Sequence, residues 1–322
     1  MSFIASRPQT ALLVVVLAVV LTAISGDVVW VDTGVMIGIY GLLALSVGLS
    51  YGQAGILSLA QAPLAAIGAY ATAILTTNHG WPPLASLLVS LALPTVLAYG
   101  LARLVIRLEP LAVALATLAM GFIVEIAIRN ADELTGGYLG LAGIPGLSWF
   151  PTPLSYLLLT WAVVVVAVFI YENLVNSAQG RALATIKHDR ARALADGVPV
   201  TRLLGNALAL SATFAGMSGW LYAHYLSYLG PTDLGAHLSI SVLLMAVVGG
   251  LNGVLGPILG AVLLSILLRL LPAQEYQGLF YGGALIVILL FARDGILGLI
   301  EGAWRVVRGW RRSARPMKEN VR

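Results

Sequence analysis

The sequence predicts an all-α polytopic membrane protein with about ten transmembrane or re-entrant helices, and three observations carry this prediction. Of the 322 residues, 59% are hydrophobic and only 10% are charged, whereas about 25% of the residues in a soluble domain are charged. The mean hydropathy is +0.94. Apolar runs recur along the chain, and one bilayer crossing needs roughly 20 residues of helix. The whole chain, 1–322, is therefore expected to form a single transmembrane domain.

The candidate helices are the apolar runs. They cover residues 11–24, 34–50, 56–77, 83–105, 111–128, 154–171, 203–228, 238–250, 254–271 and 278–292. The first run is short and follows a single arginine, Arg7, so it is compatible with a signal peptide that has a weak cleavage site at Ala23-Ile24-Ser25. A retained first helix is the favoured interpretation, because the segment before it carries so little positive charge.

The polar linkers fall into two sets by charge. The basic set comprises Arg7, Arg103, Arg107, the loop 172–202 and the tail 293–322. The acidic or neutral set comprises Asp27, Asp32, residues 78–80, Asp132, Glu133, Asp233 and Glu275. Because cytoplasmic loops carry an excess of lysine and arginine, the basic set is expected inside. The predicted organisation is a cytoplasmic N-terminus 1–10, a membrane bundle 11–292 interrupted by the cytoplasmic loop 172–202, and a basic cytoplasmic tail 293–322.

Whether the number of membrane crossings between two loops is odd or even decides where the chain must reverse. Asp27 is expected outside and Arg103 and Arg107 inside, so an odd number of crossings must separate them. If 34–77 formed one helix, the two arginines would lie outside. The polar stretch 51–63, YGQAGILSLAQAP, is therefore predicted to reverse the chain, either at the inner surface or as a break at membrane depth.

A second reversal follows from the same argument. Arg202 and Arg293 are both expected inside, so the chain must turn within 238–271, and the glycine-rich stretch 249–260, GGLNGVLGPILG, is the candidate. Interrupted apolar segments in both halves of a chain point to an inverted repeat and to a transport site built from discontinuous helices. A plain glycine hairpin is the alternative at either interruption.

Polarity at these interruptions predicts a pathway for a small polar solute. We expect Gln53, Ser58 and Gln61 to line or gate it, with no covalent chemistry. They are expected to lie opposite the second interruption, whose residues are Gly249, Gly250, Asn252, Gly253 and Gly256. The small-residue spacing there and at Gly216 and Gly219 also indicates close helix packing.

The longest polar interval, 172–202, is predicted to hold a short amphipathic cytoplasmic helix. Within 180–196, apolar residues recur every three or four positions with basic residues between them, and Gly197 and Pro199 end the pattern. Such a helix either lies on the membrane surface or docks into a groove on a partner protein. Positive charge at the inner leaflet alone also explains the basic residues. The tail, with Trp304 and Trp310, fits an interfacial helix or a plain positive tail.

Several classes of chemistry are excluded by residues that the sequence lacks. There is no cysteine, so disulfides, thiolate metal ligands and cysteine nucleophiles are absent. The lysines are Lys187 and Lys318, and neither follows the pattern of a phosphate-binding loop, so any ATP hydrolysis must come from another chain. No catalytic pair is apparent on facing helices. We therefore expect neither enzyme activity nor a cofactor, a metal site or binding of nucleic acid.

Charged residues within the apolar runs are few. Glu125 and Arg129 are four residues apart near the outer end of 111–128, where they can pair as a structural ion pair or as a substrate contact. His224 is expected at the membrane interface among tyrosines, with a proton relay as the alternative, and Arg269 is expected to extend outward. This pattern argues against an ion-coupled carrier. A secondary transporter or channel for a small polar solute is the alternative function.

Three stretches resemble a known family. They are GLLALSVGLSYGQAGILSLAQAPLAAIGAYATA at 41–73, LTGGYLGLAGIP at 134–145, and DGVPVTRLLGNALALSATFAGMSGWLYAHYLSYLGPTDLGAHLSISVLLMAVVGGLNGVLGPILGA at 196–261. They resemble the permease subunits of branched-chain amino-acid ABC importers, specifically the M-type partner of a permease pair. The likeness extends over about 34–292. It implies a multi-pass protein of the bacterial inner membrane.

The resemblance also implies partners. These are a homologous second permease subunit, two cytoplasmic ATP-binding subunits and a periplasmic substrate-binding protein. Docking of an ATP-binding subunit would fall to the loop 180–197, where Ala191, Ala193 and Gly197 are similar to a docking-loop signature. The coupling residues expected on this basis are Gly180, Arg181, Arg190, Ala193 and Gly197.

The sequence departs from the family pattern at two places. Related permeases often carry an acid and an arginine about one turn earlier than Glu125 and Arg129. Tyr138 and Leu139 follow Thr-Gly-Gly where amino-acid importers tend to have a polar residue. Related permeases also serve urea and short amides. A branched-chain amino acid is therefore the expected substrate, with urea or a short amide as alternatives.

Overall fold

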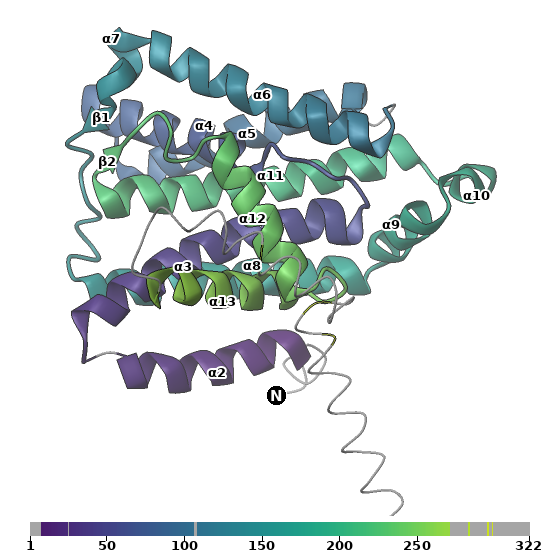
Figure 1. Ribbon diagram of the computed structural model, residues 1–322, viewed down its shortest axis with the longest axis horizontal. Coiled ribbons are helices and arrows are strands. Elements are labelled where there is room, and N and C mark those ends of the chain that lie inside the picture. The colour runs from purple at the N-terminus through teal and green to yellow at the C-terminus, as the bar shows by residue number, and fades with distance from the viewer. Residues whose placement is uncertain are drawn as a thin grey trace, which may run out of the picture.

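A computed structural model describes residues 8–24, 26–105 and 108–270, together with Gly283, Gly295 and Gly298. Those residues form a bundle of helices (Figure 1). Four helices are long and apolar enough to cross a membrane, namely Val28–Gln53, Pro83–Leu104, Pro110–Asn130 and Pro153–Asn176, and the shorter apolar helices are Pro8–Leu21, Ala236–Gly249 and Gly256–Arg269. The prediction of a helical membrane protein is confirmed, and the number of crossings stays a prediction. Apart from those glycines, the predicted helix 278–292 and tail 293–322 lie outside the described residues, as do Arg7 and Arg107.

The two ends of the bundle are recognised by their loops (Figure 1). At one end lie the short helices α9 (Ala178–His188) and α10 (Arg190–Ala195), which belong to the basic loop predicted to be cytoplasmic. We name this the inner end. At the outer end, strands β1 (Leu141–Ala142) and β2 (Tyr228–Leu229) pair antiparallel, with Leu141 opposite Leu229. This small strand pair was not part of the all-helical prediction.

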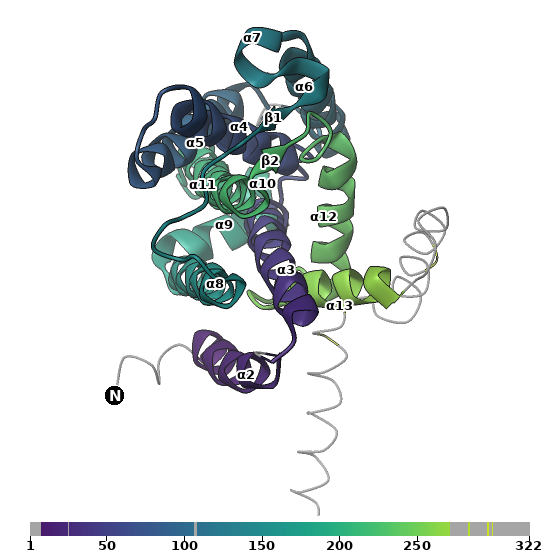
Figure 2. The ribbon, with the colours of Figure 1, turned by 90° about the vertical axis from the view of Figure 1, so that its left-hand side faces the viewer.

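Helix α3 (Val28–Val47) is the centre of the bundle and continues into the π-helical turn η1 (Gly48–Gln53). Asp27 caps α3, because its carboxylate accepts the backbone N–H of Val29 at 2.9 Å. Most of α3 is buried between α8 (Pro153–Asn176), α11 (Val200–Leu226) and α13 (Gly256–Leu270). Helix α2 (Pro8–Ile24) lies at the edge of the bundle and packs on α8 (Figure 2).

Three helices pack closely through small residues. They are α4 (Gln61–Ala73), which runs on into η2 (Ile74–Asn78), α5 (Pro83–Val105) and α11. The Ser90 hydroxyl donates to the carbonyl of Gly216 at 2.9 Å. A Cβ at Gly219 would lie 2.1 Å from the carbonyl oxygen of Ala65. The close packing predicted at Gly216 and Gly219 is therefore confirmed.

Helix α6 (Pro110–Asn130) forms a loosely covered edge of the bundle. It begins with a proline, which suits the first turn of a helix, and it ends at the outer loop. That loop contains α7 (Asp132–Thr135) and the short turn η3 (Gly137–Leu139). Many apolar side chains of α6 are exposed, including Leu111, Leu115 and Ile123. In a membrane, these side chains contact lipid or another protein.

A sharp turn joins the last two described helices. Helix α12 (Ala236–Gly249) runs across the other long helices rather than along them (Figures 1 and 2), and α13 follows after a short break. A Cβ at Gly249 would lie 1.8 Å from the carbonyl oxygen of Gly256, and a Cβ at Gly260 would lie 1.8 Å from that of Met245. Glycine is therefore required for this approach, and the chain turns sharply where the second interruption was predicted. The predicted reversal of crossing direction there stays a prediction.

Candidate functional site

The first interruption combines a turn at the inner end with extended chain inside the bundle. In η1, the carbonyl of Gly48 accepts the Tyr171 hydroxyl at 2.7 Å, and the carbonyl of Gly52 accepts the Lys187 ammonium at 2.6 Å. Because α9 carries Lys187, α3 and η1 end at the inner end. Residues 54–60 then return without forming a helix, and α4 begins only at Gln61. The chain therefore reverses at the predicted polar stretch, and the depth of this reversal in the membrane stays a prediction.

Gln61 lies in a buried group of polar side chains, which we name the polar cluster: Ser46, Ser50, Gln61 and Ser211. The Gln61 carbonyl oxygen accepts the hydroxyls of Ser46 and Ser211, each at 3.2 Å. Its amide group donates to the Ser50 hydroxyl at 3.2 Å. Gln61 is 1% exposed. The start of α4 is thus fixed to α3 and α11 by side-chain hydrogen bonds in the core.

A cavity of about 250 Å³ borders the polar cluster, and we name it the membrane cavity. Ser58, Gln61 and Thr117 provide its polar edge, and its other walls are apolar side chains of α4, α5, α6 and α11. The backbone N–H of Leu59 donates to the Thr117 hydroxyl at 2.9 Å, so α6 holds the extended segment in place. A mostly apolar cavity with few polar groups is typical of small-molecule sites. Two of the three predicted pathway residues meet here.

Gln53, the third predicted pathway residue, lies elsewhere. Its side-chain amide donates to the carbonyl of Gly180 in α9 at 3.0 Å. We name Gly52, Gln53, Gly180 and Lys187 the inner clamp, because two hydrogen bonds join α9 to the end of η1. Partial burial also lowers the pKa of the Lys187 ammonium. Gln53 therefore connects the predicted docking loop to the central helix.

The glycine break between α12 and α13 packs against the same turn. A Cβ at Gly52 would lie 2.7 Å from the carbonyl oxygen of Leu251, and a Cβ at Gly48 would lie 2.6 Å from the Pro257 ring. Gly250 has a φ of 110°, which glycine alone adopts readily. The break that holds the predicted residues Gly249, Gly250, Asn252, Gly253 and Gly256 thus packs on η1 through Leu251 and Pro257. Gln61, which was expected opposite the break, bonds instead to the three serines of the polar cluster.

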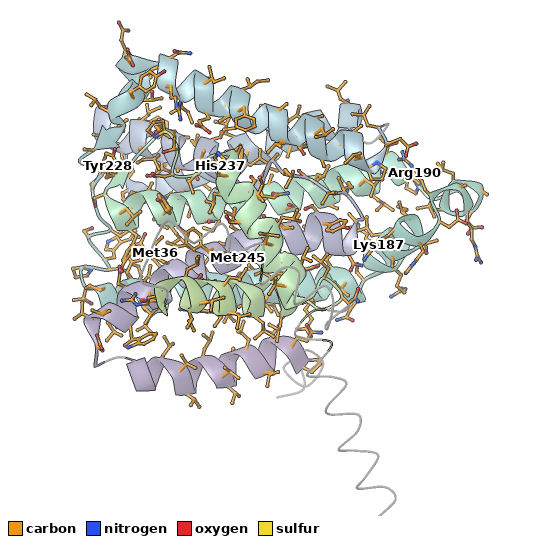
Figure 3. The ribbon with its side chains drawn as sticks, in the orientation of Figure 1. Met36, Lys187, Arg190, Tyr228, His237 and Met245 are labelled. Carbon is orange, nitrogen blue, oxygen red and sulfur yellow. The ribbon has the colours of Figure 1, made fainter. Side chains whose placement is uncertain are left out.

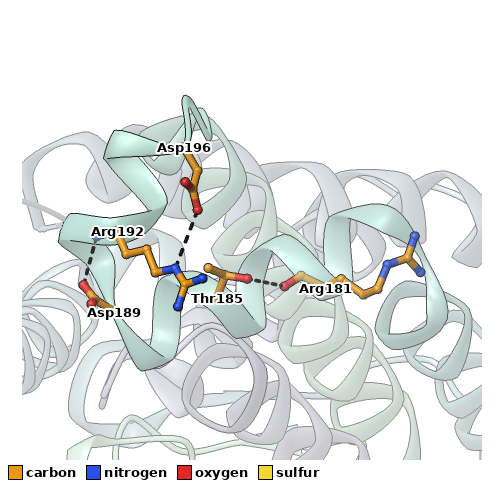
Figure 4. Close-up of polar contacts among 5 residues, drawn as sticks. All are labelled: Arg181, Thr185, Asp189, Arg192 and Asp196. Atoms are coloured by element: carbon orange, nitrogen blue, oxygen red, sulfur yellow. Dashed lines mark hydrogen bonds and ion pairs between the residues drawn. The ribbon is translucent and has the colours of Figure 1, made fainter.

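The predicted docking loop contains two helices where one was expected over 180–196. Asp189 separates them and caps the second, since its carboxylate accepts the backbone N–H of Arg192 at 2.9 Å (Figure 4). Gly197 has a φ of 75°, and the chain leaves α10 there, as expected from its position. An N-cap residue inside the basic run is the signal that would have predicted the break.

Side chains of this loop divide into buried and exposed ones. Ala193 is 0% exposed, and its cluster includes Val200 and Leu204 of α11, so it holds α10 against this chain. Leu194, one of the apolar residues whose spacing predicted the amphipathic helix, is 58% exposed. Arg181 is exposed and donates to the carbonyl of Asn176 at 3.1 Å. Of the predicted coupling residues, Ala193 is therefore packed inside this chain, whereas Arg181 and Arg190 are exposed.

Glu125 and Arg129 form the predicted ion pair. The distance from Arg129 Nη2 to Glu125 Oε1 is 2.5 Å, and the guanidinium lies 5.7 Å from the ring centre of Tyr138 in the outer loop. A Cβ at Gly235 would lie 2.8 Å from Glu125 Oε2, so the carboxylate also faces the start of α12. The pair joins α6 to the outer loop and lies apart from the residues that line the membrane cavity.

Two other charged or ionisable residues differ in their surroundings. His224 is 2% exposed, with Nδ1 2.7 Å from the carbonyl oxygen of Pro145, so it is packed inside this chain beside the outer loop, and its position at the membrane interface stays a prediction. Close packing against Trp220 explains the burial. Arg269 is exposed, as predicted, and its guanidinium lies 5.6 Å from the ring centre of Trp30.

Glu172 is a structural residue that the sequence did not indicate. It was assigned to the polar loop, yet it belongs to α8 and is 3% exposed. Its carboxylate accepts the backbone N–H groups of Gln9 and Thr10 at 3.2 and 3.0 Å. Gln9 in turn accepts the backbone N–H of Val254 at 3.1 Å. Glu172 therefore fastens α2 beside the glycine break.

Comparisons with known proteins agree on one family. The model of the branched-chain amino acid transport system permease component matches residues 29–289. The high-affinity branched-chain amino acid transport system permease protein LivM of Salmonella typhimurium is 30% identical over 312 residues, covering 87% of this chain and 72% of that protein. LivM of Escherichia coli strain K12 is 28% identical with the same coverage. No solved structure matches.

Proposed function

This chain belongs to the family of branched-chain amino acid transport permeases, and on that premise we propose that it is the membrane subunit of an ABC importer. It passes a branched-chain amino acid from a periplasmic binding protein to the cytoplasm by ATP-driven alternating access. Urea or a short amide is the alternative substrate class. The chain contributes no ATP hydrolysis, and it acts in the bacterial inner membrane as one domain over 1–322.

The inner clamp is the observation that carries this proposal. An importer needs a contact through which an ATP-binding subunit moves the transport helices. Gln53 and Lys187 bond α9 directly to the end of the longest apolar helix, Val28–Gln53. Any displacement of α9 by a docked subunit therefore pulls on η1, and η1 packs on the glycine break. A free surface helix would not need these two bonds.

The membrane cavity supports a route for an amino acid with an apolar side chain. Its walls are mainly alanine and leucine, and Ser58, Gln61 and Thr117 supply hydroxyl and amide groups. In alternating access, a shift of η1 would change how the extended segment 54–60 lies between α6 and the polar cluster. We assign the pathway to Ser58 and Gln61, and we assign Gln53 to coupling.

The partners have separate surfaces available to them. Two ATP-binding subunits would serve the pair of permeases, one at each inner end, and here the contacts would be α9, α10 and the exposed Leu194. The homologous second permease would cover exposed apolar side chains of α6. The periplasmic binding protein would contact the outer loop, where Tyr138 and Leu139 are 72% and 85% exposed.

Reconstitution with the partner subunits tests this proposal. Gly197→Ala forces an alanine into a backbone conformation that costs about 1 kcal/mol for residues other than glycine, and Ala193→Leu separates α10 from α11. Both variants are expected to retain ATP hydrolysis while losing uptake. Unchanged coupling in both would remove the docking role. Uptake by the permeases without ATP-binding subunits would favour the alternative of a secondary transporter or channel.

A further inference from the structure

A second pocket lies at the inner end, and its chemistry is distinct from that of the membrane cavity. Its volume is about 360 Å³, and it lies between the segment 54–57, the start of α6, the end of α9 and the base of α11. We name it the inner pocket. Glu109 lines it from one side, and Lys187 and Arg190 line it from another, at the inner end shown in Figure 3. Ile56, Val113 and Ile186 are among its apolar walls.

The Glu109 carboxylate and the Lys187 ammonium line this pocket without forming an ion pair with each other. In the described part of the chain, the ion pairs are Arg129 with Glu125 and Arg192 with Asp196, so Glu109 and Lys187 are not paired. Glu109 precedes α6 but makes no capping hydrogen bond with its side chain. Lys187 uses one of its three donors on the carbonyl of Gly52. The acidic and the basic group are therefore both available to a ligand.

We infer that the inner pocket binds a zwitterionic α-amino acid with an apolar side chain on the cytoplasmic side. The ammonium group of Lys187 receives the ligand carboxylate, the Glu109 carboxylate receives the ligand ammonium, and the aliphatic wall receives the side chain. Charge-assisted hydrogen bonds of this kind are stronger than neutral ones. A ligand that lacks one of the charges leaves a protein charge unpaired, which gives the pocket its selectivity.

The position of the pocket agrees with this ligand. Ile56 and Leu108 line both the inner pocket and the membrane cavity, so the two share a wall. An amino acid that leaves the membrane cavity would reach the inner pocket next. Arg190, the first residue of α10, lines the pocket, whereas Leu194 and Arg192 do not. An ATP-binding subunit that contacts this chain through Leu194 would therefore leave the pocket open to cytoplasmic amino acid. This inference rests on the proposed function, which supplies the amino acid.

The absence of native cysteine makes the pocket directly testable. Leu57 lines the inner pocket, so Leu57→Cys places a single thiol there. The complete transporter, with its partner subunits, is prepared in inside-out vesicles, and the rate of maleimide labelling is measured. We expect L-leucine to slow labelling of Leu57→Cys, whereas 4-methylpentanoate, which lacks the ammonium, and 3-methylbutylamine, which lacks the carboxylate, do so only weakly. Arg103→Cys is the control, because Arg103 is exposed, lines neither cavity and lies outside the docking loop, and it should label equally fast with each compound.

A second variant tests the role of charge. In the Leu57→Cys background, Glu109→Gln should raise the L-leucine concentration needed for half-protection roughly tenfold, because it removes one charge-assisted bond. It should leave the weak effect of 4-methylpentanoate unchanged. Arg192→Gln removes a charge from the same loop outside the pocket and should have no effect.

Three outcomes would overturn the inference. The first is that L-leucine does not slow labelling, and the second is that the two singly charged analogues slow it as much as L-leucine does. The third is that the ATP-binding subunit slows labelling by itself, whether or not L-leucine is present. ATP-driven uptake is measured in parallel with right-side-out vesicles of the same transporter. Uptake without leucine protection would remove the inner pocket and leave the transport proposal intact. Protection without ATP-driven uptake would remove the transport proposal and leave the pocket.

Discussion

At the scale of single residues, polar groups in the core serve two different purposes. Ser211 and Ser218 lie two turns apart on α11, and each hydroxyl donates to a backbone carbonyl of α3, those of Ser46 and Ile39, at 2.8 and 3.1 Å. Only Ser211 also bonds to Gln61. The two serines thus form the same kind of structural bond, and one of them additionally orders a residue of the membrane cavity.

This pairing gives a matched test of the polar cluster. Ser211→Ala and Ser218→Ala should each lower stability by about 1 kcal/mol, because each removes one hydroxyl that donates to a backbone carbonyl of α3. Only Ser211→Ala should also reduce transport at equal protein level, since it releases Gln61. Thermal unfolding in detergent and uptake in vesicles measure the two effects. Equal transport by the two variants would place the polar cluster outside the pathway.

The Glu125–Arg129 pair is expected to be structural. Glu125→Gln leaves the half-buried Arg129 unpaired and should destabilise the protein by about 1–3 kcal/mol, after allowance for solvent screening. The double variant, with Arg129→Gln added, should be more stable than the sum of the single changes predicts. A double-mutant cycle of thermal unfolding measures this coupling. Additive effects would show that the two side chains do not interact.

At the scale of elements, the glycines of the α12–α13 turn set the distance between two helices. Gly260→Ala brings a Cβ against the Met245 carbonyl and should destabilise the protein by about 2–3 kcal/mol. Gly100→Ala is the control, because no atom lies within 4 Å of a Cβ there, and alanine suits the interior of helix α5. Thermal unfolding compares the two variants. Similar losses would contradict the close packing of α12 on α13.

Helix α10 is expected to contact the ATP-binding subunit through Leu194. Leu194→Asp places a charge on this exposed side chain and should weaken binding of that subunit by about tenfold or more, without unfolding the chain. Leu139→Asp makes the same change at the outer end and should leave that affinity unaltered. Titration of the ATP-binding subunit against purified permease measures both. Equal affinities would place the contact elsewhere on the loop.

At the scale of the whole molecule, the sequence was most informative where charge and hydropathy act together. Parity of crossings required a reversal before Arg103, and the chain does reverse at residues 51–60. The sequence could not assign Gln53 and Gln61 to different neighbours, because both are polar residues of one stretch and only tertiary contacts separate them. Ala193 and Leu194 show the same limit, since adjacent residues on a short helix face opposite surroundings.

Glu172 shows a different limit of sequence reasoning. A glutamate after an apolar run ordinarily marks the end of a membrane segment. Here its carboxylate accepts hydrogen bonds from Gln9 and Thr10, residues 163 and 162 positions away along the chain. No periodicity connects positions so distant. Contacts of this kind depend on how the complete bundle packs, and local patterns do not contain them.

The arrangement of the two ends can be measured with single cysteines in a chain that has none. Arg103→Cys and Leu194→Cys should react with a membrane-impermeant maleimide from the cytoplasmic side, and Tyr138→Cys from the opposite side. Labelling of intact vesicles and of inside-out vesicles distinguishes the two sides of the membrane. If Arg103→Cys and Leu194→Cys reacted from opposite sides, the reversal at residues 51–60 would be incompatible with the labelling.

The central claim is that α9 transmits the action of an ATP-binding partner to a membrane pathway in this chain. Uptake of radiolabelled leucine into proteoliposomes with enclosed ATP tests it most directly, with both permeases, the ATP-binding subunits and the binding protein present. We predict uptake that requires ATP and every subunit, and that falls with Gly197→Ala while ATP hydrolysis continues. Equal uptake with the ATP-binding subunits left out would contradict the account.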